Sequence, residues 1–124
     1  MMAAAGLVPF SIGHSVTIIV GNETDVVATA HGYLPHNDLS PYRGYAWGGL
    51  VAVSEACRGN GLGKLVNAFM IDRVFRELGA SHIYELVSAK NVPSRRMVEA
   101  CGLKLEPGLT CGIATPHHTT RFTK

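Results

Sequence analysis

The hydrophobic pattern of this 124-residue chain changes its period at one short glycine-rich segment, Arg58–Gly63 (RGNGLG). Upstream, runs of β-branched and aromatic residues separated by turn residues predict three strands, which are His14–Asn22, Asp25–Leu34 and Tyr45–Val53. Downstream, apolar residues recur at i, i+3, i+4 and i+7 from Leu62 to Leu78, just before Gly79. This spacing predicts an amphipathic helix whose apolar stripe, Met70 included, packs in the core. An antiparallel meander must therefore lead into a helix through the glycines.

The second half of the chain continues with strand and helix patterns. Ser81–Ala89 (SHIYELVSA) predicts a strand, and Asn91–Gly102 predicts a short helix with Asn91 as N-cap and Pro93 in its first turn. Gly108–Thr115 predicts a last strand, and residues 116–124 a polar tail. The order β-β-β-α-β-α-β predicts one α/β domain over residues 1–124, with a mixed, mostly antiparallel sheet flanked by two helices.

Composition excludes several classes of protein. The chain is 47% hydrophobic and 16% charged, so it can bury a core. A net charge of +2 without a dense basic run argues against nucleic acid as a partner. No segment approaches the ~20 apolar residues that span a bilayer, and the apolar start lacks the basic residues of a signal peptide.

The cysteines and histidines do not form ligand sets. The three cysteines, Cys57, Cys101 and Cys111, are an odd number without paired spacing, which predicts free thiols in a reducing compartment, the cytoplasm. Of the six histidines only His117 and His118 are adjacent, near the C-terminus. We therefore predict no metal site.

The glycine-rich segment predicts an anion site. A P-loop needs G-x-x-x-x-G-K-[ST], but here the first glycine falls at Arg58 and the Ser/Thr at Leu65. The dinucleotide fingerprint G-x-G-x-x-G fails because its third glycine falls on Lys64. A helix start with unpaired amides, flanked by Arg58 and Lys64, still favours a phosphate or pyrophosphate. The alternative is that the glycines only shape a tight turn.

Two motifs resemble those of the GNAT superfamily of acyl-CoA-dependent N-acyltransferases. RGNGLG fits R/Q-x-x-G-x-G/A, the pyrophosphate-binding motif of that family. VSAKNVPSRRMVEACGL is similar to the downstream signature, in which an Asn, a Ser or Ala, and Glu-x-x-Gly-aliphatic follow a strand. The positions that match this signature are Asn91, Ser94, Glu99, Gly102 and Leu103. The resemblance runs from about Ser15 to Thr115.

The resemblance implies acetyl-CoA as cofactor and an amine of a small molecule or peptide as acceptor. In similar proteins the strand before the loop splays from its neighbour and pairs with the pantetheine arm, a role that falls here to Val51, Ala52 and Val53. The pyrophosphate is expected on the amides of Arg58, Gly59, Asn60, Gly61, Leu62, Gly63 and Lys64. Asn91 and Ser94 are expected to contact pantetheine, although Asn91 could equally be a helix cap, or both.

The catalytic groups are less defined. Acyl transfer needs a neutral amine, hence a base, and benefits from a proton for the leaving thiolate. Many family members supply that proton from a Tyr one place before the helix Glu, where this chain has Val98. Glu85 is a candidate base if buried, with an edge or surface position as the alternative, and His31 is a second candidate unless it is merely packed or exposed. Tyr33, Tyr45 and Trp47 could wall an acceptor pocket or belong to the strand core.

The front of the chain departs from the family pattern, in which a strand and two helices precede the strand predicted at His14. Their absence would leave a sheet edge exposed. We expect either that the chain is the C-terminal part of a larger acyltransferase or that it forms a homodimer or swaps elements. Two other functions remain open: a non-catalytic CoA-binding or regulatory module of the same fold, and an unrelated phosphate-binding α/β domain.

Overall fold

The computed structural model describes residues 6–22, 24–35, 39, 41, 43–110 and 119–123, and all side chains of this part except 10–12, 106–110 and 119–123. Its strands are β1 (Gly6–Ile12), β2 (Ser15–Gly21), β3 (Val26–Tyr33), β4 (Tyr45–Val53), β5 (His82–Ser88), β6 (Lys104–Thr110) and β7 (Thr119–Thr123). Its helical elements are η1 (Glu55–Cys57), α1 (Leu62–Arg73), η2 (Val74–Leu78) and α2 (Val92–Ala100). The described strands form one sheet in the order β1-β2-β3-β4-β5-β7-β6. The predicted mixed, mostly antiparallel α/β fold with two helices is confirmed.

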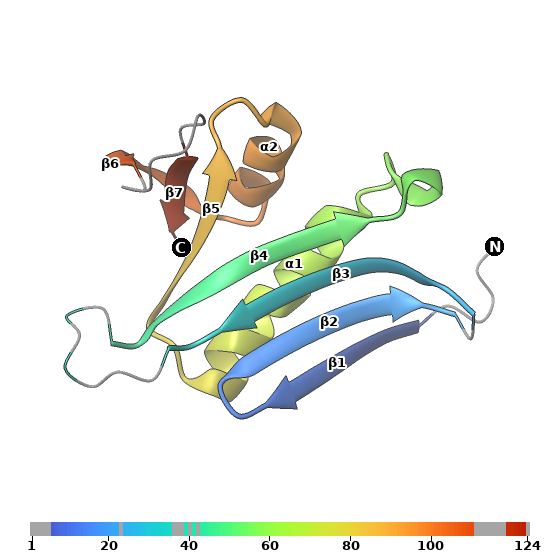
Figure 1. Cartoon of the computed structure of the whole chain (residues 1–124), viewed down its shortest axis with the longest axis horizontal. Coiled ribbons are helices and arrows are strands. Elements are labelled where there is room, and N and C mark those ends of the chain that lie inside the picture. The colour runs from blue at the N-terminus through green and yellow to red at the C-terminus, as the bar shows by residue number, and fades with distance from the viewer. Residues whose placement is uncertain are drawn as a thin grey trace.

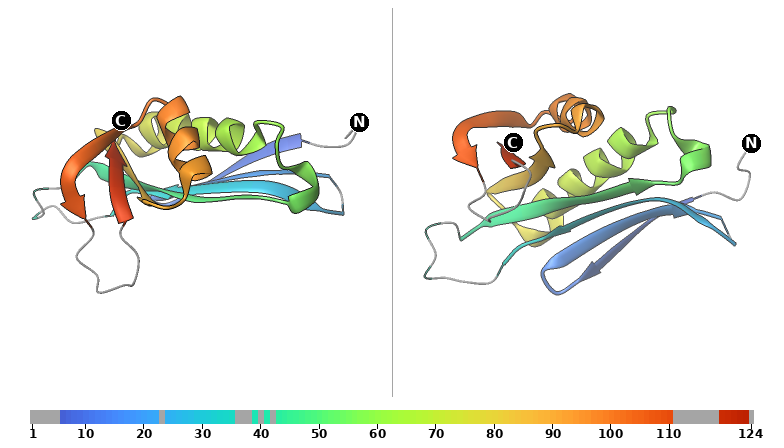
Figure 2. Two further views of the ribbon diagram at one scale, coloured as in Figure 1. Left: turned by 90° about the horizontal axis from the view of Figure 1, so that it is seen from above. Right: turned by 45° about the horizontal axis from the view of Figure 1, so that its top comes forward.

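Both α-helices lie on the same side of the sheet (Figure 2). Small residues let α1 approach closely: a Cβ atom added to Gly32 would stand 2.7 Å from both Met70 Sδ and Val74 Cγ2. The alternating inward residues of β2 and β3, among them Val16, Ile18 and Ala30, complete this core. The residues that alternate with these along β2 and β3 point away from the helices, so the opposite face of the sheet carries a separate set of side chains.

The sheet opens between β4 and β5. These strands pair in parallel only from Tyr45–His82 to Gly48–Glu85, and Figure 1 shows them diverging beyond that point like the arms of a V. On its other side, β4 carries a bulge, because Thr29 pairs with Ala52 and His31 pairs with Gly49. Leu50, inside the bulge, has a φ of 49°, a left-handed conformation that a non-glycine residue seldom adopts.

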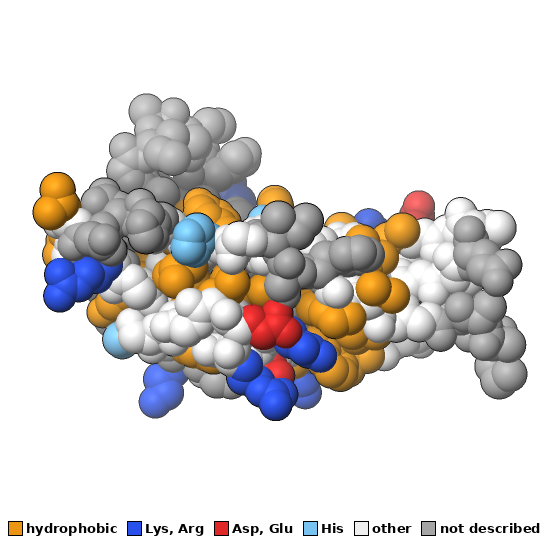
Figure 3. Space-filling view, turned by 90° about the horizontal axis from the view of Figure 1, so that it is seen from below, with side chains coloured by type: hydrophobic (Ala, Val, Ile, Leu, Met, Phe, Trp, Pro, Cys, Tyr) orange, Lys and Arg blue, Asp and Glu red, His pale blue; other side chains and the backbone are white. Residues whose placement is uncertain are grey.

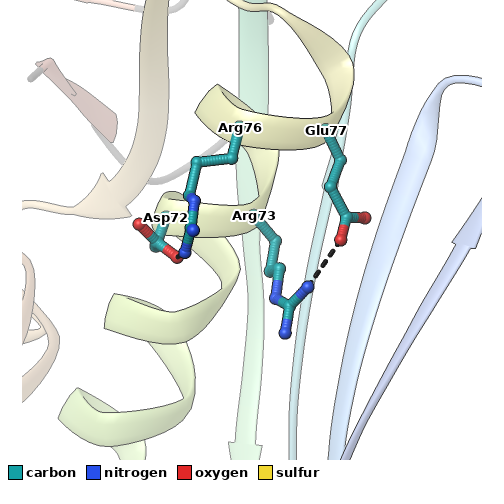
Figure 4. A network of polar contacts seen from close by, with 4 residues as sticks. All are labelled: Asp72, Arg73, Arg76 and Glu77. Atoms are coloured by element: carbon teal, nitrogen blue, oxygen red, sulfur yellow. Dashed lines mark hydrogen bonds and ion pairs between the residues drawn. The ribbon is translucent and has the colours of Figure 1, made fainter.

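Ion pairs cover the exposed end of the α1–η2 segment. Arg73 pairs with Glu77 at 2.7 Å and Arg76 with Asp72 at 3.2 Å, both one helical turn apart (Figure 4).

Seen from below, the molecule also shows an interrupted band of hydrophobic side chains with acidic and basic groups beside it (Figure 3). The helix ends where predicted, at Gly79, whose φ is 71°.

The prediction that the N-terminal strand is missing is wrong. β1 pairs with β2 from Gly6–Gly21 to Ile12–Ser15, and only the turn at Gly13 and His14 separates the two strands. The edge of β2, which we expected to be open, is therefore covered by the chain itself. The two helices of the family pattern do not occur between β1 and β2.

Two predictions at the C-terminal end also need correction. The last strand was placed at Gly108–Thr115, but β6 begins earlier, at Lys104, and ends at Thr110; residues 111–115 lie outside the described part. Thr119–Thr123, which we assigned to a polar tail, forms β7 between β5 and β6. This strand pairs antiparallel with β5 from Tyr84–Thr123 to Ser88–Thr119, so it completes the sheet.

Details of the helix stripe and the cysteines follow the predictions in part. Met70, Val66 and Val74 are fully buried, but Leu65 and Phe69 are 47% and 40% exposed, so they are not core residues. In the described part of the chain, Cys57 and Cys101 form no disulfide bond, whereas Cys111, His117 and His118 lie outside the described residues. Within the described part, no helix has the length and apolar character needed to cross a lipid bilayer.

Candidate functional site

The end of β4 has one side on which no neighbouring strand pairs with its backbone. The N–H of Ser54 donates to the carbonyl of Val27 in β3 at 2.7 Å, so the alternate residues Val51 and Val53 direct their N–H and C=O groups away from β3. Pairing with β5 has already ended at Gly48. Consistently, Arg58 Nε reaches back to donate to the Val53 carbonyl at 3.2 Å. Val51 and Val53 therefore offer an extended backbone edge to a ligand.

The glycine-rich loop starts α1 at this edge. Gly59 and Gly61 have φ values of 86° and 73°, in the left-handed region that favours glycine. The predicted helix start is confirmed, because α1 begins at Leu62 with Gly61 as its N-cap. A Cβ atom added to Gly63 would stand 3.5 Å from Val53 Cγ2 and 3.7 Å from Val51 Cγ1. The first turn of α1 thus lies directly over the free edge of β4.

The start of α2 forms the opposite wall. Asn91 Oδ1 accepts a hydrogen bond from the Ser94 N–H at 3.1 Å, so Asn91 caps this helix, as one of its two interpretations required. Between the walls lies an outer cleft of about 580 Å³. Its lining residues are Val51, Ala52, Val53, Arg58, Gly63, Asn91, Pro93, Ser94 and Met97. Seven of the predicted cofactor residues meet there; Gly59, Asn60, Gly61, Leu62 and Lys64 do not line the cleft, although they form its glycine loop and helix start.

A deeper cleft continues from the outer one into the opening of the V. It measures about 190 Å³ and shares Val51, Asn91, Ser94 and Met97 with the outer cleft. Glu85 on β5 lines its floor together with Val98 of α2. The backbone groups of the splayed strands and the polar groups of α2 thus surround one continuous groove.

Glu85 is buried, which decides between its two interpretations. Its side chain is 2% exposed, and Asn67 of α1, itself fully buried, donates from Nδ2 to Glu85 Oε2 at 2.8 Å. The second oxygen, Oε1, is buried without a hydrogen-bond partner, as is Asn67 Oδ1. Burial raises the pKa of the Glu85 carboxyl to about 7, and the hydrogen bond from Asn67 opposes this rise only in part.

His31 lies on the other face of the sheet. Its Nδ1 is 2.7 Å from Thr17 Oγ1, and its ring stacks against Tyr33. A third cleft, of about 310 Å³, is lined by His31, Tyr33, Trp47, Gly48, Gly49, Leu50 and Leu86. It shares Gly49, Leu50 and Leu86 with the deeper cleft, so the two clefts adjoin at the bulge. Tyr45 stacks on His82 instead of lining this pocket.

Several site residues were not predicted. Asn67 was overlooked, although it stands four residues after Gly63 on the face of α1 that packs on the sheet. Gly49 and Leu50, the bulge residues, read only as strand. Met97 and Leu86 were overlooked because each has an ordinary place in a helix or strand pattern.

Solved structures of acetyltransferases share this fold. The structure of yncA from Salmonella typhimurium, determined with acetyl-CoA, is 18% identical, with a TM-score of 0.73 over 89% of this chain and 64% of that one. Ribosomal-protein-alanine N-acetyltransferase from Brucella melitensis is 19% identical, with a TM-score of 0.73 over 89% of this chain and 68% of that one. Spermidine N-acetyltransferase from Vibrio cholerae, a dodecamer, is 15% identical, with a TM-score of 0.69 over 90% and 65% of the two chains. The chain therefore spans about two thirds of the length of these proteins.

Residues 7–103 match the family model described as Acetyltransferase (GNAT) family, and the chain belongs to this family. The matched segment runs from β1 to the end of α2 and contains both predicted motifs. A comparison with curated protein sequences gave no match. The structural neighbours acetylate acceptors as different as a protein and a polyamine, so the fold alone does not indicate the acceptor.

Proposed function

We propose that this protein is an acetyl-CoA-dependent N-acetyltransferase. The observation that carries the proposal is that the three clefts adjoin: the outer and deeper clefts share four lining residues, and the deeper cleft and the aromatic pocket on the other face share three. A long cofactor and a small acceptor can therefore meet from opposite sides of the sheet. When bound, acetyl-CoA supplies an activated acetyl group as a thioester.

The residues present fit this cofactor. Val51 and Val53 line the outer cleft and direct their backbone groups away from β3, which suits the amides of a pantetheine arm, although the Val53 carbonyl already accepts a hydrogen bond from Arg58. The amides of the α1 N-terminus, with the helix dipole, favour a pyrophosphate. Arg58 adds a positive charge, and Ser94 adds a hydroxyl group to the wall formed by α2.

The acceptor amine is proposed to enter through the pocket of His31, Tyr33 and Trp47. Of its ring nitrogens, His31 uses Nδ1 toward Thr17, which leaves Nε2 to take a proton from the amine. The aromatic and aliphatic lining favours an amine attached to a flat apolar group, whose burial would supply binding free energy.

Calorimetric titration with acetyl-CoA tests the cofactor, and release of free thiol across an amine panel tests the transfer. We expect micromolar binding and faster thiol release with arylalkylamines than with polyamines. ATP binding in the absence of acetyl-CoA binding would refute the proposal and favour the unrelated phosphate-binding domain.

A non-catalytic CoA-binding module is the second candidate. Val98 in the place of the family tyrosine and the direct β1–β2 turn support it, because both remove parts associated with transfer in similar proteins. Binding of acetyl-CoA without thiol release for any amine of the panel would favour this candidate.

A further inference from the structure

We propose that the carboxyl group of Glu85 returns the proton to the CoA sulfur when the thioester is broken, in place of the tyrosine for which Val98 stands. The inference rests on the proposed function and assigns one chemical step within it. Two observations carry it: Glu85 and Val98 line the same cleft, and one oxygen of the buried Glu85 carboxyl group has no hydrogen-bond partner.

The orientation of Glu85 separates it from the acceptor. Residues alternate along β5, so Leu86 faces the aromatic pocket while Glu85 faces α1 and its hydrogen-bond partner Asn67. Glu85 does not line the aromatic pocket, and His31 does not line the deeper cleft. His31 therefore lies on the side where the amine is proposed to enter, and Glu85 lies on the side of the thioester. This separation suits His31 to the role of base and Glu85 to the role of acid.

Burial among uncharged groups favours the protonated form of Glu85, against the opposing effect of the hydrogen bond from Asn67. Asn67 approaches from α1, Gly48 is its parallel neighbour in β4, and Val98 faces the cleft from α2. None of these groups is titratable, and Glu85 is the sole titratable residue in the lining of the deeper cleft. With a pKa raised to about 7 by burial, a large share of the carboxyl groups carries a proton at neutral pH. Asn67 holds Oε2, so Oε1 is the oxygen that is left without a hydrogen-bond partner.

The proton balance of the step is complete. The acceptor nitrogen forms the new bond to the acetyl carbon and loses one proton, which His31 or water takes up. Glu85 gives its own proton to sulfur as the carbon–sulfur bond breaks and its electron pair stays on sulfur, which yields the free thiol and the Glu85 carboxylate. A proton from solvent then restores the carboxyl group. A thiol with a pKa near ~8.5 is a weaker acid than this carboxyl, so the transfer runs downhill.

The test compares wild type, E85Q, E85Q/V98Y and the control E99Q. Gln keeps an oxygen for the hydrogen bond from Asn67 but has no acidic proton, and Glu99 is an exposed glutamate on α2. Thiol release from acetyl-CoA is followed with hydroxylamine, a small nucleophile that needs little recognition by the aromatic pocket. We expect E85Q to lower kcat by ~100-fold or more, the usual contribution of a general acid, with little change in KM for acetyl-CoA. In E85Q/V98Y, activity should partly return and persist to higher pH, toward the tyrosine pKa of ~10.

A second readout does not depend on turnover. CoA binding is measured by calorimetry at pH 7.5 in phosphate and in Tris, whose different ionisation enthalpies reveal protons taken up on binding. Wild type should take up part of a proton, because a ligand over Glu85 excludes water and raises its pKa further; E85Q should lack this uptake. Equal kcat values or equal proton uptake in wild type and E85Q would overturn the inference. In that case retained acetyl-CoA binding would leave the proposed function intact, whereas absent binding in wild type would refute the function itself.

Discussion

Replacement of Glu85 by Gln should stabilise the protein, by an amount that depends on pH. The unfolded carboxyl loses its proton near 4.5, whereas the folded one keeps it up to about 7. Between these values the folded state binds more protons than the unfolded state, so the free energy of unfolding of wild type falls as pH rises. Over this interval, at ~1.36 kcal/mol per pH unit, the loss amounts to about 3 kcal/mol. E85Q has no such proton to lose.

The measurement is urea denaturation of both proteins between pH 4.5 and 8. Their stabilities should be similar at pH 4.5 and diverge until about pH 7, above which E85Q stays more stable by a constant margin. E99Q removes the same charge at an exposed site of α2 and controls for the change in net charge. Parallel pH profiles for wild type and E85Q would mean that Glu85 is not held uncharged in the folded protein, and the argument for it as a proton donor would fail.

Three further predictions concern the clefts and the core. Gly63→Ala should keep acetyl-CoA affinity, since its Cβ would make only ordinary contacts of 3.5 Å and 3.7 Å. Gly63→Leu should fill the outer cleft and lower the affinity measured by calorimetry at least ~10-fold, about 1.4 kcal/mol. Equal affinities of the two variants would mean that the cofactor binds elsewhere. Gly32→Ala should lower the free energy of unfolding, measured by urea denaturation, by about 1–3 kcal/mol, because the added methyl group overpacks against Met70. The control Gly6→Ala, which has open space around it, should leave the free energy of unfolding nearly unchanged. An unchanged free energy of unfolding for Gly32→Ala would show that α1 can move away from the sheet. Trp47→Ala should raise KM for arylalkylamines several-fold without changing acetyl-CoA affinity, and a matching loss for both ligands would indicate a general structural defect.

The central part of the fold follows from local patterns in the sequence. The strands β2, β3 and β4, the helical segment formed by α1 and η2, and α2 lie within two residues of their predicted bounds, because alternation and helical periodicity persist over whole elements there. The glycine loop was predictable for the same reason: glycines, helix start and basic neighbours are all contiguous in sequence. The helix cap formed by Asn91 was also predictable, because Asn91 stands directly before a helix that carries Pro93 in its first turn.

The edges of the fold were not predictable in this way. β1 contains Pro9, a residue that reads as a strand breaker and is tolerated at an edge. β6 spans Leu105 to Gly108, where Pro-Gly reads as a turn. β7 is short and mostly polar, so its own sequence does not indicate a strand. Its pairing with β5 is a long-range contact, which local sequence patterns do not predict. These three strands are stabilised by pairing with other strands of the sheet: β1 with β2, β7 with β5, and β6 with β7.

The site shows the same division between local and long-range information. Glu85 could be suspected from a charge inside a strand, but its burial depends on Asn67, which lies on another element. The splay between β4 and β5 depends on the bulge at Gly49 and Leu50, which arises only when β4 pairs with β3. Residues that define the cofactor edge were therefore predicted from a family motif, whereas the groups that complete the cleft required the structure.

Two costly features of this protein coincide at one place. Leu50 adopts a left-handed φ of 49°, which typically costs about 1–3 kcal/mol, and Glu85 leaves a buried oxygen without a partner, which is also unfavourable. Either could be relieved by an ordinary substitution, glycine for the first and a neutral side chain for the second. Both line the deeper cleft. Since neither feature favours folding, their common position supports the proposal that acetyl transfer takes place at this cleft.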